Sequence, residues 1–324
     1  MEEDGYCLEG DQWADFQAIA LAGYLPEIRY WLGRDNWARF GLISFGNEFG
    51  DGFGNGSAES SSGVSSNTSP GGGYYRSAGG GAGKQAEFFS LSLAERKRIL
   101  EIATDEAGDK CGVMMSCSDE KFDTVLDLAD HAQAAGADYI IVHSPPLYFH
   151  KTVDDVLYEY YRHICERLEI GVAIWHQPDY GYVMGPEVCA RIAELPNIVA
   201  IKYSVPRDLY TQLTRMAGDK LLVSTSSEEQ WLENIHELGW QVYPCLTPPY
   251  LMQTKHDRRM QEYTDLALRG EIDAARRVRD SLDPVRAALR DTRPADKPQA
   301  HQKYWQELLG QTGGPVRRPS RHMG

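Results

Sequence analysis

Short apolar runs alternate with amphipathic stretches over much of the 324-residue chain. Each run is continuously apolar, which is typical of strands in a parallel sheet that helices cover on both faces. Six runs are predicted as strands: 111–116, 138–146, 171–178, 197–204, 220–227 and 240–246. Because a helical pattern separates each run from the next, the sequence predicts consecutive βα units, as in a (β/α)8 barrel or a doubly wound sheet.

Helical periodicity marks the segments between these strands. Ser92 and Glu95 form the capping-box pattern that begins a helix. The next helix is predicted within 119–136, with Gly136 at its C-terminal end. One face of that helix carries Phe122, Val125, Ala129 and Ala132. Further helices are predicted at 152–168, 185–195, 207–218 and 228–239.

The two ends of the chain differ from its middle. After residue 255 the pattern is purely helical, with helices predicted at 256–270, 271–290 and 300–310 and a loose tail at 312–324. Near the N-terminus, 16–26 and 39–46 are candidate strands, and 47–83 is rich in Gly and Ser and is expected to be mobile. We therefore divide the chain into a possible divergent first βαβ unit (1–46), a mobile insertion (47–83), a barrel core (84–255) and a C-terminal helical region (256–324).

Charge and composition restrict the partners. A formal net charge of −14 argues against nucleic acid and anionic membranes, but it does not exclude an anionic small molecule. No run approaches the length of a membrane span, and the acidic start has no signal-peptide core, so we expect a cytoplasmic protein. The six cysteines are scattered and are expected to be small buried residues, and neither they nor the nine histidines show metal-ligand spacing.

A lysine at the end of an apolar run is the most informative single residue. Lys202 follows four apolar residues, 198–201, in a predicted strand. Residues at the C-terminal ends of barrel strands face the active site, and a buried lysine requires a partner or a lowered pKa. A neutral amine is a nucleophile toward ketones. Lys202 is therefore either a Schiff-base lysine or an ion-paired structural lysine. Other polar or aromatic residues at strand ends are Ser116, Ser118, His143, Ser144, Tyr148, Trp175, His176, Ser224 and Tyr243.

Five motifs, in order, resemble the dihydrodipicolinate synthase / N-acetylneuraminate lyase family of class I aldolases. They are GKQAEFFSLS (83–92), GADYIIVHSPPLY (136–148), GVAIWHQP (171–178), NIVAIKYS (197–204) and GGPVRRP (313–319). The resemblance implies a (β/α)8 TIM barrel with a C-terminal helical extension, assembled as a homo-oligomer, a dimer or a tetramer. It also implies a 2-oxo acid, commonly pyruvate, that is bound as an imine to Lys202 without any other cofactor.

The chain departs from the family pattern at positions that matter for proton transfer. Trp175 stands where the family has a tyrosine, and an indole offers only an N–H donor. His176 is adjacent and could shuttle protons. However, neighbours on a strand point to opposite faces, so a packed or surface histidine is the simpler interpretation. Lys84 and Gln85 replace a hydroxyl pair that binds the substrate carboxylate. Lys84 could bind the substrate carboxylate through its charge and Gln85 through its amide, or both side chains could be solvated.

Two functional interpretations remain open from the sequence. The first is a Schiff-base lyase, an aldolase or a dehydratase, acting on pyruvate or a larger 2-oxo acid. Its catalytic candidates are Lys202 and Tyr148, and its substrate-binding candidates are Lys84, Gln85, Trp175, His143 and Ser224. Tyr148 could equally be a packing residue. The second interpretation is a catalytically impaired family member that acts as a binding or assembly subunit.

Overall fold

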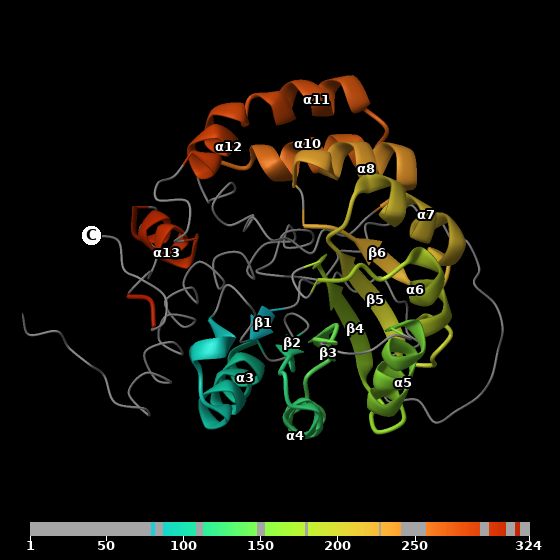
Figure 1. Ribbon diagram of the computed structural model, residues 1–324. Helices are drawn as coiled ribbons and strands as arrows, with labels where there is room; N and C mark the ends of the chain where they lie inside the picture. The colour runs from blue at the N-terminus through green and yellow to red at the C-terminus, as the bar shows by residue number, and fades with distance from the viewer. Residues whose placement is uncertain are drawn as a thin grey trace, which may run out of the picture.

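A parallel sheet lies at the centre of the protein (Figure 1). The computed structural model describes residues 79–81, 87–107, 113–147, 153–178, 181–226, 228–240, 257–291, 298–308 and 315–317. Within these segments, six strands pair in sequence order, and every neighbouring pair is parallel. The strands are β1 (Gly79–Gly81), β2 (Val113–Ser116), β3 (Tyr139–His143), β4 (Gly171–His176), β5 (Ile198–Tyr203) and β6 (Leu222–Ser224).

Helices follow the strands in alternation and lie around the outside of the sheet (Figure 1). They are α3 (Leu93–Ala107), α4 (Phe122–Ala134), α5 (Val153–Cys165), α6 (Pro186–Ile192), α7 (Arg207–Ala217) and α8 (Trp231–Leu238). Two 3-10 turns, η1 (Phe88–Ser90) and η3 (Glu228–Gln230), precede α3 and α8. The α/β class that the sequence predicts is therefore confirmed. No helix in the described segments combines the length and apolar character that crossing a membrane would need.

The two faces of the sheet belong to different clusters, because successive side chains on a strand point to opposite faces. The small core cluster consists of Met114, Tyr139, Ile141, Ala173, Trp175 and Ala200. The alternate strand residues join the helices in a larger cluster: Val113, Met115, Ile140, Val142, Val172, Ile174, Ile201 and Tyr203. Since both faces are buried, the strands are apolar throughout, which is the pattern seen in the sequence.

Several of the predicted elements fall outside the described segments. These are the candidate strands at 16–26 and 39–46, and the last predicted strand, 240–246, apart from Trp240. The expected mobility of 47–83 is wrong for Gly79–Gly81, which pair with Val113–Met115 of β2. Glycine lacks a side chain, but its backbone N–H and C=O groups pair as those of any residue do.

The C-terminal region is helical, as predicted, but its middle differs from the prediction. Its helices are α10 (Arg259–Leu268), α11 (Ile272–Asp280), α12 (Asp283–Arg290) and α13 (Pro298–Leu308). The prediction of one helix over 271–290 is wrong. Pro284 has no N–H to donate, so the helix ends before it and a new one begins with the proline in its first turn. The expected loose tail is also wrong for residues 315–317, because Val316 is buried and Arg317 makes several hydrogen bonds.

The described cysteines behave as the sequence predicts. Cys117, Cys165 and Cys189 are buried free thiols, and burial raises the pKa of Cys165 to about 12. The other three cysteines of the chain lie outside the described segments.

The capping box at the start of α3 is confirmed. The backbone N–H of Ser92 donates to Glu95 Oε2 at 2.7 Å, and the backbone N–H of Glu95 donates to Ser92 Oγ at 3.3 Å. We expect Ser92→Ala to lower the free energy of unfolding by about 1 kcal/mol, since one helix N–H loses its acceptor. Urea unfolding measures this change. Ser92→Thr keeps the hydroxyl and should retain most of the stability; equal losses in both variants would contradict the role of the cap.

Candidate active site

Four of the predicted site residues lie side by side across the sheet, and we call them the site row: His143, Trp175, Lys202 and Ser224. In the strand register His143 pairs with Trp175, Trp175 with Lys202, and Lys202 with Ser224. Three members of the site row each follow a residue of the small core cluster by two positions along the strand. These cluster residues are Ile141, Ala173 and Ala200. The site row therefore continues the face of that cluster at the C-terminal ends of the strands, where parallel α/β proteins place their sites.

Lys202 is fully buried, with its amine against an aromatic ring. Its Nζ lies 4.1 Å from the centroid of the Trp175 ring, and both side chains are at most 1% exposed. A ring face attracts an ammonium group, so Trp175 would lower the cost of burying this side chain in its protonated form. Trp175 thus lies beside the Lys202 amine, although it offers no acid or base.

Two buried donors of the site row have no hydrogen-bond partner among the described residues. They are Nε1 of Trp175 and Oγ of Ser224, and their residues flank Lys202 on the two neighbouring strands. Buried donors are nearly always paired, so an unpaired one requires an explanation. Oxygen atoms of a bound substrate would satisfy both donors on the two sides of Lys202.

His143 closes the other end of the site row. Its ring meets the Trp175 ring nearly at right angles, with 4.2 Å between the centroids. Its backbone N–H donates to Ser118 Oγ at 3.0 Å, which ties the end of β3 to the loop after β2. Ser116 and Ser118, whose Oγ atoms lie 3.4 Å apart, extend this polar edge.

His176 belongs to the opposite face of the sheet, as expected from strand alternation. It is fully buried, and its Nε2 accepts the backbone N–H of Met184 at 3.1 Å. Since Nε2 accepts, Nδ1 carries the proton and donates to Ser144 Oγ at 2.8 Å. The interpretation of His176 as a packed histidine is confirmed. It does not point toward Lys202, so it is no proton carrier for that amine.

Three predicted site residues, Lys84, Gln85 and Tyr148, lie outside the described residues, and their roles remain predictions. Sequence reasoning also missed a buried residue beside the site. Arg96 of α3 is 2% exposed and donates to the carbonyl oxygens of Ser116 and Ser118, each at 2.9 Å. Burial lowers its pKa from the ordinary value. The sequence did carry a signal for Arg96. The residues three and four positions after it are apolar, so the arginine lies on the buried face of the helix.

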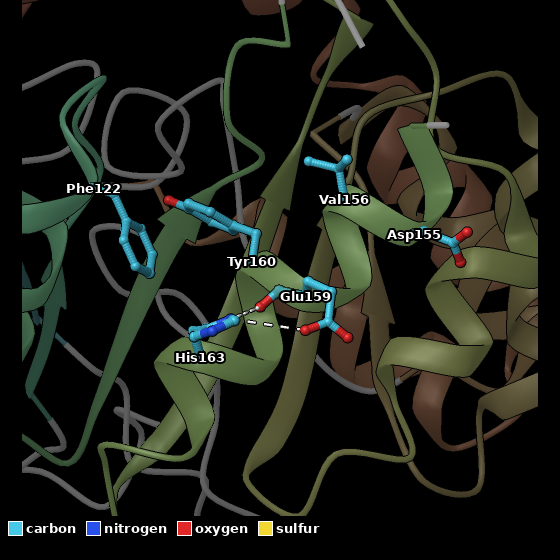
Figure 2. Close-up of a pocket in the computed structure, with 6 residues that line it drawn as sticks. All are labelled: Phe122, Asp155, Val156, Glu159, Tyr160 and His163. Carbon is cyan, nitrogen blue, oxygen red and sulfur yellow. Dashed lines mark hydrogen bonds and ion pairs between the residues drawn. The ribbon is translucent and has the colours of Figure 1, made fainter. Parts of the chain in front are cut away.

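A separate pocket lies on the outer surface, between the start of α4 and the side of α5 (Figure 2). Its lining residues are Phe122, Asp155, Val156, Glu159, Tyr160 and His163. Asp155 pairs with Arg191 and Glu159 with Arg162, so these carboxylates are already neutralised. All six residues come from covering helices and none from a strand end. This pocket is therefore not part of the site row.

Comparisons with known proteins give a consistent result. A model of the "Dihydrodipicolinate synthetase family" matches residues 78–321. The chain is 32% identical over 152 residues to a 4-hydroxy-tetrahydrodipicolinate synthase of Hyphomonas neptunium, a match that covers 47% of this chain and only 49% of that relative. It is 27% identical over 241 residues to the 4-hydroxy-tetrahydrodipicolinate synthase of Methanospirillum hungatei, covering 73% of this chain and 78% of the relative.

The fold is similar to that of solved dihydrodipicolinate synthases. The structure from Aquifex aeolicus has a TM-score of 0.66 at 21% identity, covering 76% of this chain and 81% of that one. A monomeric dihydrodipicolinate synthase variant has a TM-score of 0.65 at 21% identity, with coverage of 76% and 80%. At this level of identity the likeness supports the fold, and it confirms the predicted barrel class. The described residues themselves show six of its strands.

Proposed function

The chain belongs to the dihydrodipicolinate synthetase family, and on that premise we propose that it binds a 2-oxo acid as an imine on Lys202. The expectation of a lyase of the dihydrodipicolinate synthase type is confirmed at the level of the family. The observation that carries the finer proposal is the buried amine of Lys202 at a strand end, with unpaired donors on both sides. Nothing in the comparisons favours the alternative of an inactive binding or assembly subunit.

The proposed reaction begins with attack of the neutral, deprotonated Lys202 Nζ on the C2 carbonyl carbon of the 2-oxo acid. The resulting carbinolamine loses one water and becomes a protonated imine. In a C–C cleavage, the electron pair of the breaking bond passes to the protonated imine, and an enamine forms. In a dehydration, removal of the C3 proton gives the enamine first, and the enamine then expels the C4 hydroxyl group as water. Splitting the reaction in this way replaces one difficult step by easier ones. After C–C cleavage, protonation of the enamine carbon regenerates the imine. Hydrolysis of the imine by water then releases the 2-oxo acid product and returns the lysine.

Proton transfer requires a group other than Trp175, because an indole neither donates nor accepts protons near neutral pH. Tyr148 is our candidate for this role, and Lys84 and Gln85 are our candidates for holding the substrate carboxylate. Ser224 and Trp175 would donate hydrogen bonds to other substrate oxygens. We propose pyruvate or a larger 2-oxo acid as the substrate, with no cofactor beyond the lysine imine.

The assembly and the location of the protein remain expectations. A homo-oligomer agrees with the family resemblance, although a monomeric variant of dihydrodipicolinate synthase has been solved. A cytoplasmic location agrees with the sequence.

Borohydride trapping tests the proposed function. The protein is incubated with pyruvate, or with a panel of larger 2-oxo acids, in the presence of borohydride, and its peptides are then analysed by mass spectrometry. We expect a reduced adduct on Lys202 that is absent when the oxo acid is omitted. If no oxo acid of the panel gives an adduct, or if the adduct lies on another lysine, the proposed imine is wrong.

Trp175→Phe tests the proposed indole hydrogen bond. The variant keeps the ring face over Lys202 but removes Nε1–H, so we expect KM to rise about tenfold while kcat changes less. Trp231→Phe is the matched control. Its indole is also buried, but its N–H donates to Thr264 Oγ1 at 3.0 Å between α8 and α10. The control should lose stability without a change in KM. Equal KM values for wild type and Trp175→Phe would contradict the hydrogen bond.

A further inference from the structure

A continuous series of ring contacts leads from η1 to Lys202. The rings of Phe88 and His143 meet edge to face with 5.9 Å between their centroids. The His143 ring meets Trp175 at 4.2 Å, and the Trp175 ring lies 4.1 Å from the Lys202 Nζ. Because buried interiors are closely packed, a displacement of Phe88 reaches the amine through two rings.

The turn that carries Phe88 is held by a buried carboxylate. Glu87 is fully buried and has a φ of 57°, and among the described residues no other non-glycine residue has a positive φ. Its Oε2 accepts a hydrogen bond from Lys303 Nζ at 2.6 Å, and its Oε1 accepts the backbone N–H of Arg317 at 2.9 Å. Backbone conformations of this kind persist where surrounding contacts over-determine them, and they cluster at functional sites.

Arg317 holds the same turn at its other end. Its guanidinium donates to the carbonyl oxygen of Ser90 and to Oε2 of Glu95, each at 2.9 Å. Burial alone would raise the pKa of Glu95, but hydrogen bonds from Arg317 and Ser92 outweigh it, so the pKa lies below its ordinary value. One C-terminal arginine therefore connects the residue before Phe88, the end of η1 and the capping box of α3.

A cation also contacts the Phe88 ring. The guanidinium carbon of Arg96 lies 5.2 Å from the centroid of the Phe88 ring. Arg96 in turn binds the carbonyl oxygen of Ser118, whose hydroxyl accepts the backbone N–H of His143. Phe88 thus lies between two residues that are joined to each other through Ser118. It has little freedom to move without moving His143.

We propose that Phe88 is a positioning residue for Lys202: the turn 87–90, held by Lys303 and Arg317, presses the Phe88 ring against His143 and so fixes Trp175 against the reactive amine. This inference rests on the proposed imine chemistry of Lys202. It gives the C-terminal segment at 315–317 a part in catalysis, because this segment holds the turn although it follows Lys202 by more than a hundred residues. Phe88 does not touch the substrate in this proposal.

Comparison of Phe88→Leu with Phe122→Leu tests the proposal. Both phenylalanines are partly buried and contact a histidine and another aromatic ring, but Phe122 does so in the outer pocket, against Tyr160 and His163 (Figure 2). The readout is the rate constant of borohydride trapping at saturating pyruvate, at a temperature where circular dichroism shows every variant folded. We expect Phe88→Leu to slow trapping about ten- to a hundredfold, the order expected for a misplaced reactive group. Phe122→Leu should match the wild type.

Glu87→Gln gives a second measurement that keeps the size of the side chain. It should also slow trapping, and Glu87→Gln/Phe88→Leu should slow it less than the product of the single effects, because both act through one contact. If wild type traps pyruvate and Phe88→Leu traps as fast as Phe122→Leu, the positioning role is wrong while the imine stands. If Phe88→Leu does not fold, a wild-type rate in Glu87→Gln overturns the proposal. Absence of trapping in the wild type overturns the proposed function itself.

Discussion

Lys202→Met is expected to eliminate the borohydride-trapped adduct and to lower turnover of a 2-oxo acid substrate by at least about a thousandfold, the order seen when a covalent nucleophile is removed. Methionine matches the length of the lysine stem but has no amine, so the imine cannot form. The variant should remain folded, since it replaces a buried polar group by an apolar one of similar volume. Trapping, steady-state kinetics and urea unfolding of the same preparation measure these three effects.

Lys220→Met is the matched control for this substitution. Lys220 is half exposed and pairs with Glu194 at 2.6 Å, so its loss should change neither trapping nor turnover. A Lys202→Met protein that still gives a reduced adduct would show that another lysine forms the imine. Loss of the adduct in both variants would show that the substitution acts through stability rather than through the nucleophile.

Most of the middle of the fold could be predicted because its strands are buried on both faces. The stretches 198–201 and 171–175 have no polar interruption, and the order of the strands along the chain is also their order in the sheet. Gly79–Gly81 could not be recognised as a strand, because only its backbone takes part in the pairing. The break at Pro284 could have been predicted, since a proline inside a helical pattern ends the helix before it.

The residues of the site row could be found from the sequence, but their arrangement could not. Strand-end position identified Lys202, Trp175, His143 and Ser224 one by one. Which of them are neighbours depends on the register of three strand pairs, and the sequence of a single strand does not determine a register when both faces are apolar.

Contacts between distant segments were beyond sequence reasoning. Glu87 and Arg317 belong to two motifs at opposite ends of the family match, and each motif was recognised separately. Their hydrogen bond forms because the fold brings the C-terminal segment at 315–317 into contact with the turn at 87–90. The same is true of the buried pair between Glu228 and Arg286, which joins the loop after β6 to the C-terminal helices. Charges of this kind look solvated in a sequence, because their partners lie far along the chain.

Arg286→Met is expected to lower the free energy of unfolding by about 3–5 kcal/mol, the cost of leaving a buried charge without its partner. The Nε and Nη2 atoms of Arg286 donate to the two oxygens of Glu228 at 2.6 and 2.7 Å, and the side chains are 8% and 3% exposed. Burial disfavours the charge of Arg286, but the hydrogen bonds to Glu228 outweigh it and raise the pKa of the guanidinium. Urea unfolding measures the loss.

Arg290→Met is the matched control, with the same substitution on the same helix. Arg290 pairs with Glu229 at 3.7 Å, and both side chains are more than 60% exposed, so its loss should cost less than about 1 kcal/mol. Equal losses for Arg286→Met and Arg290→Met would contradict the importance of the buried pair. Glu228→Gln/Arg286→Met should recover part of the stability that Arg286→Met loses, because no buried carboxylate then remains unpaired. Such a recovery would mean that the ion pair adds little to the free energy of unfolding. Its main effect would be to specify where α12 packs against the loop after β6. The buried charges would then fix the attachment of the C-terminal helices to the segment that follows Ser224, the last residue of the site row.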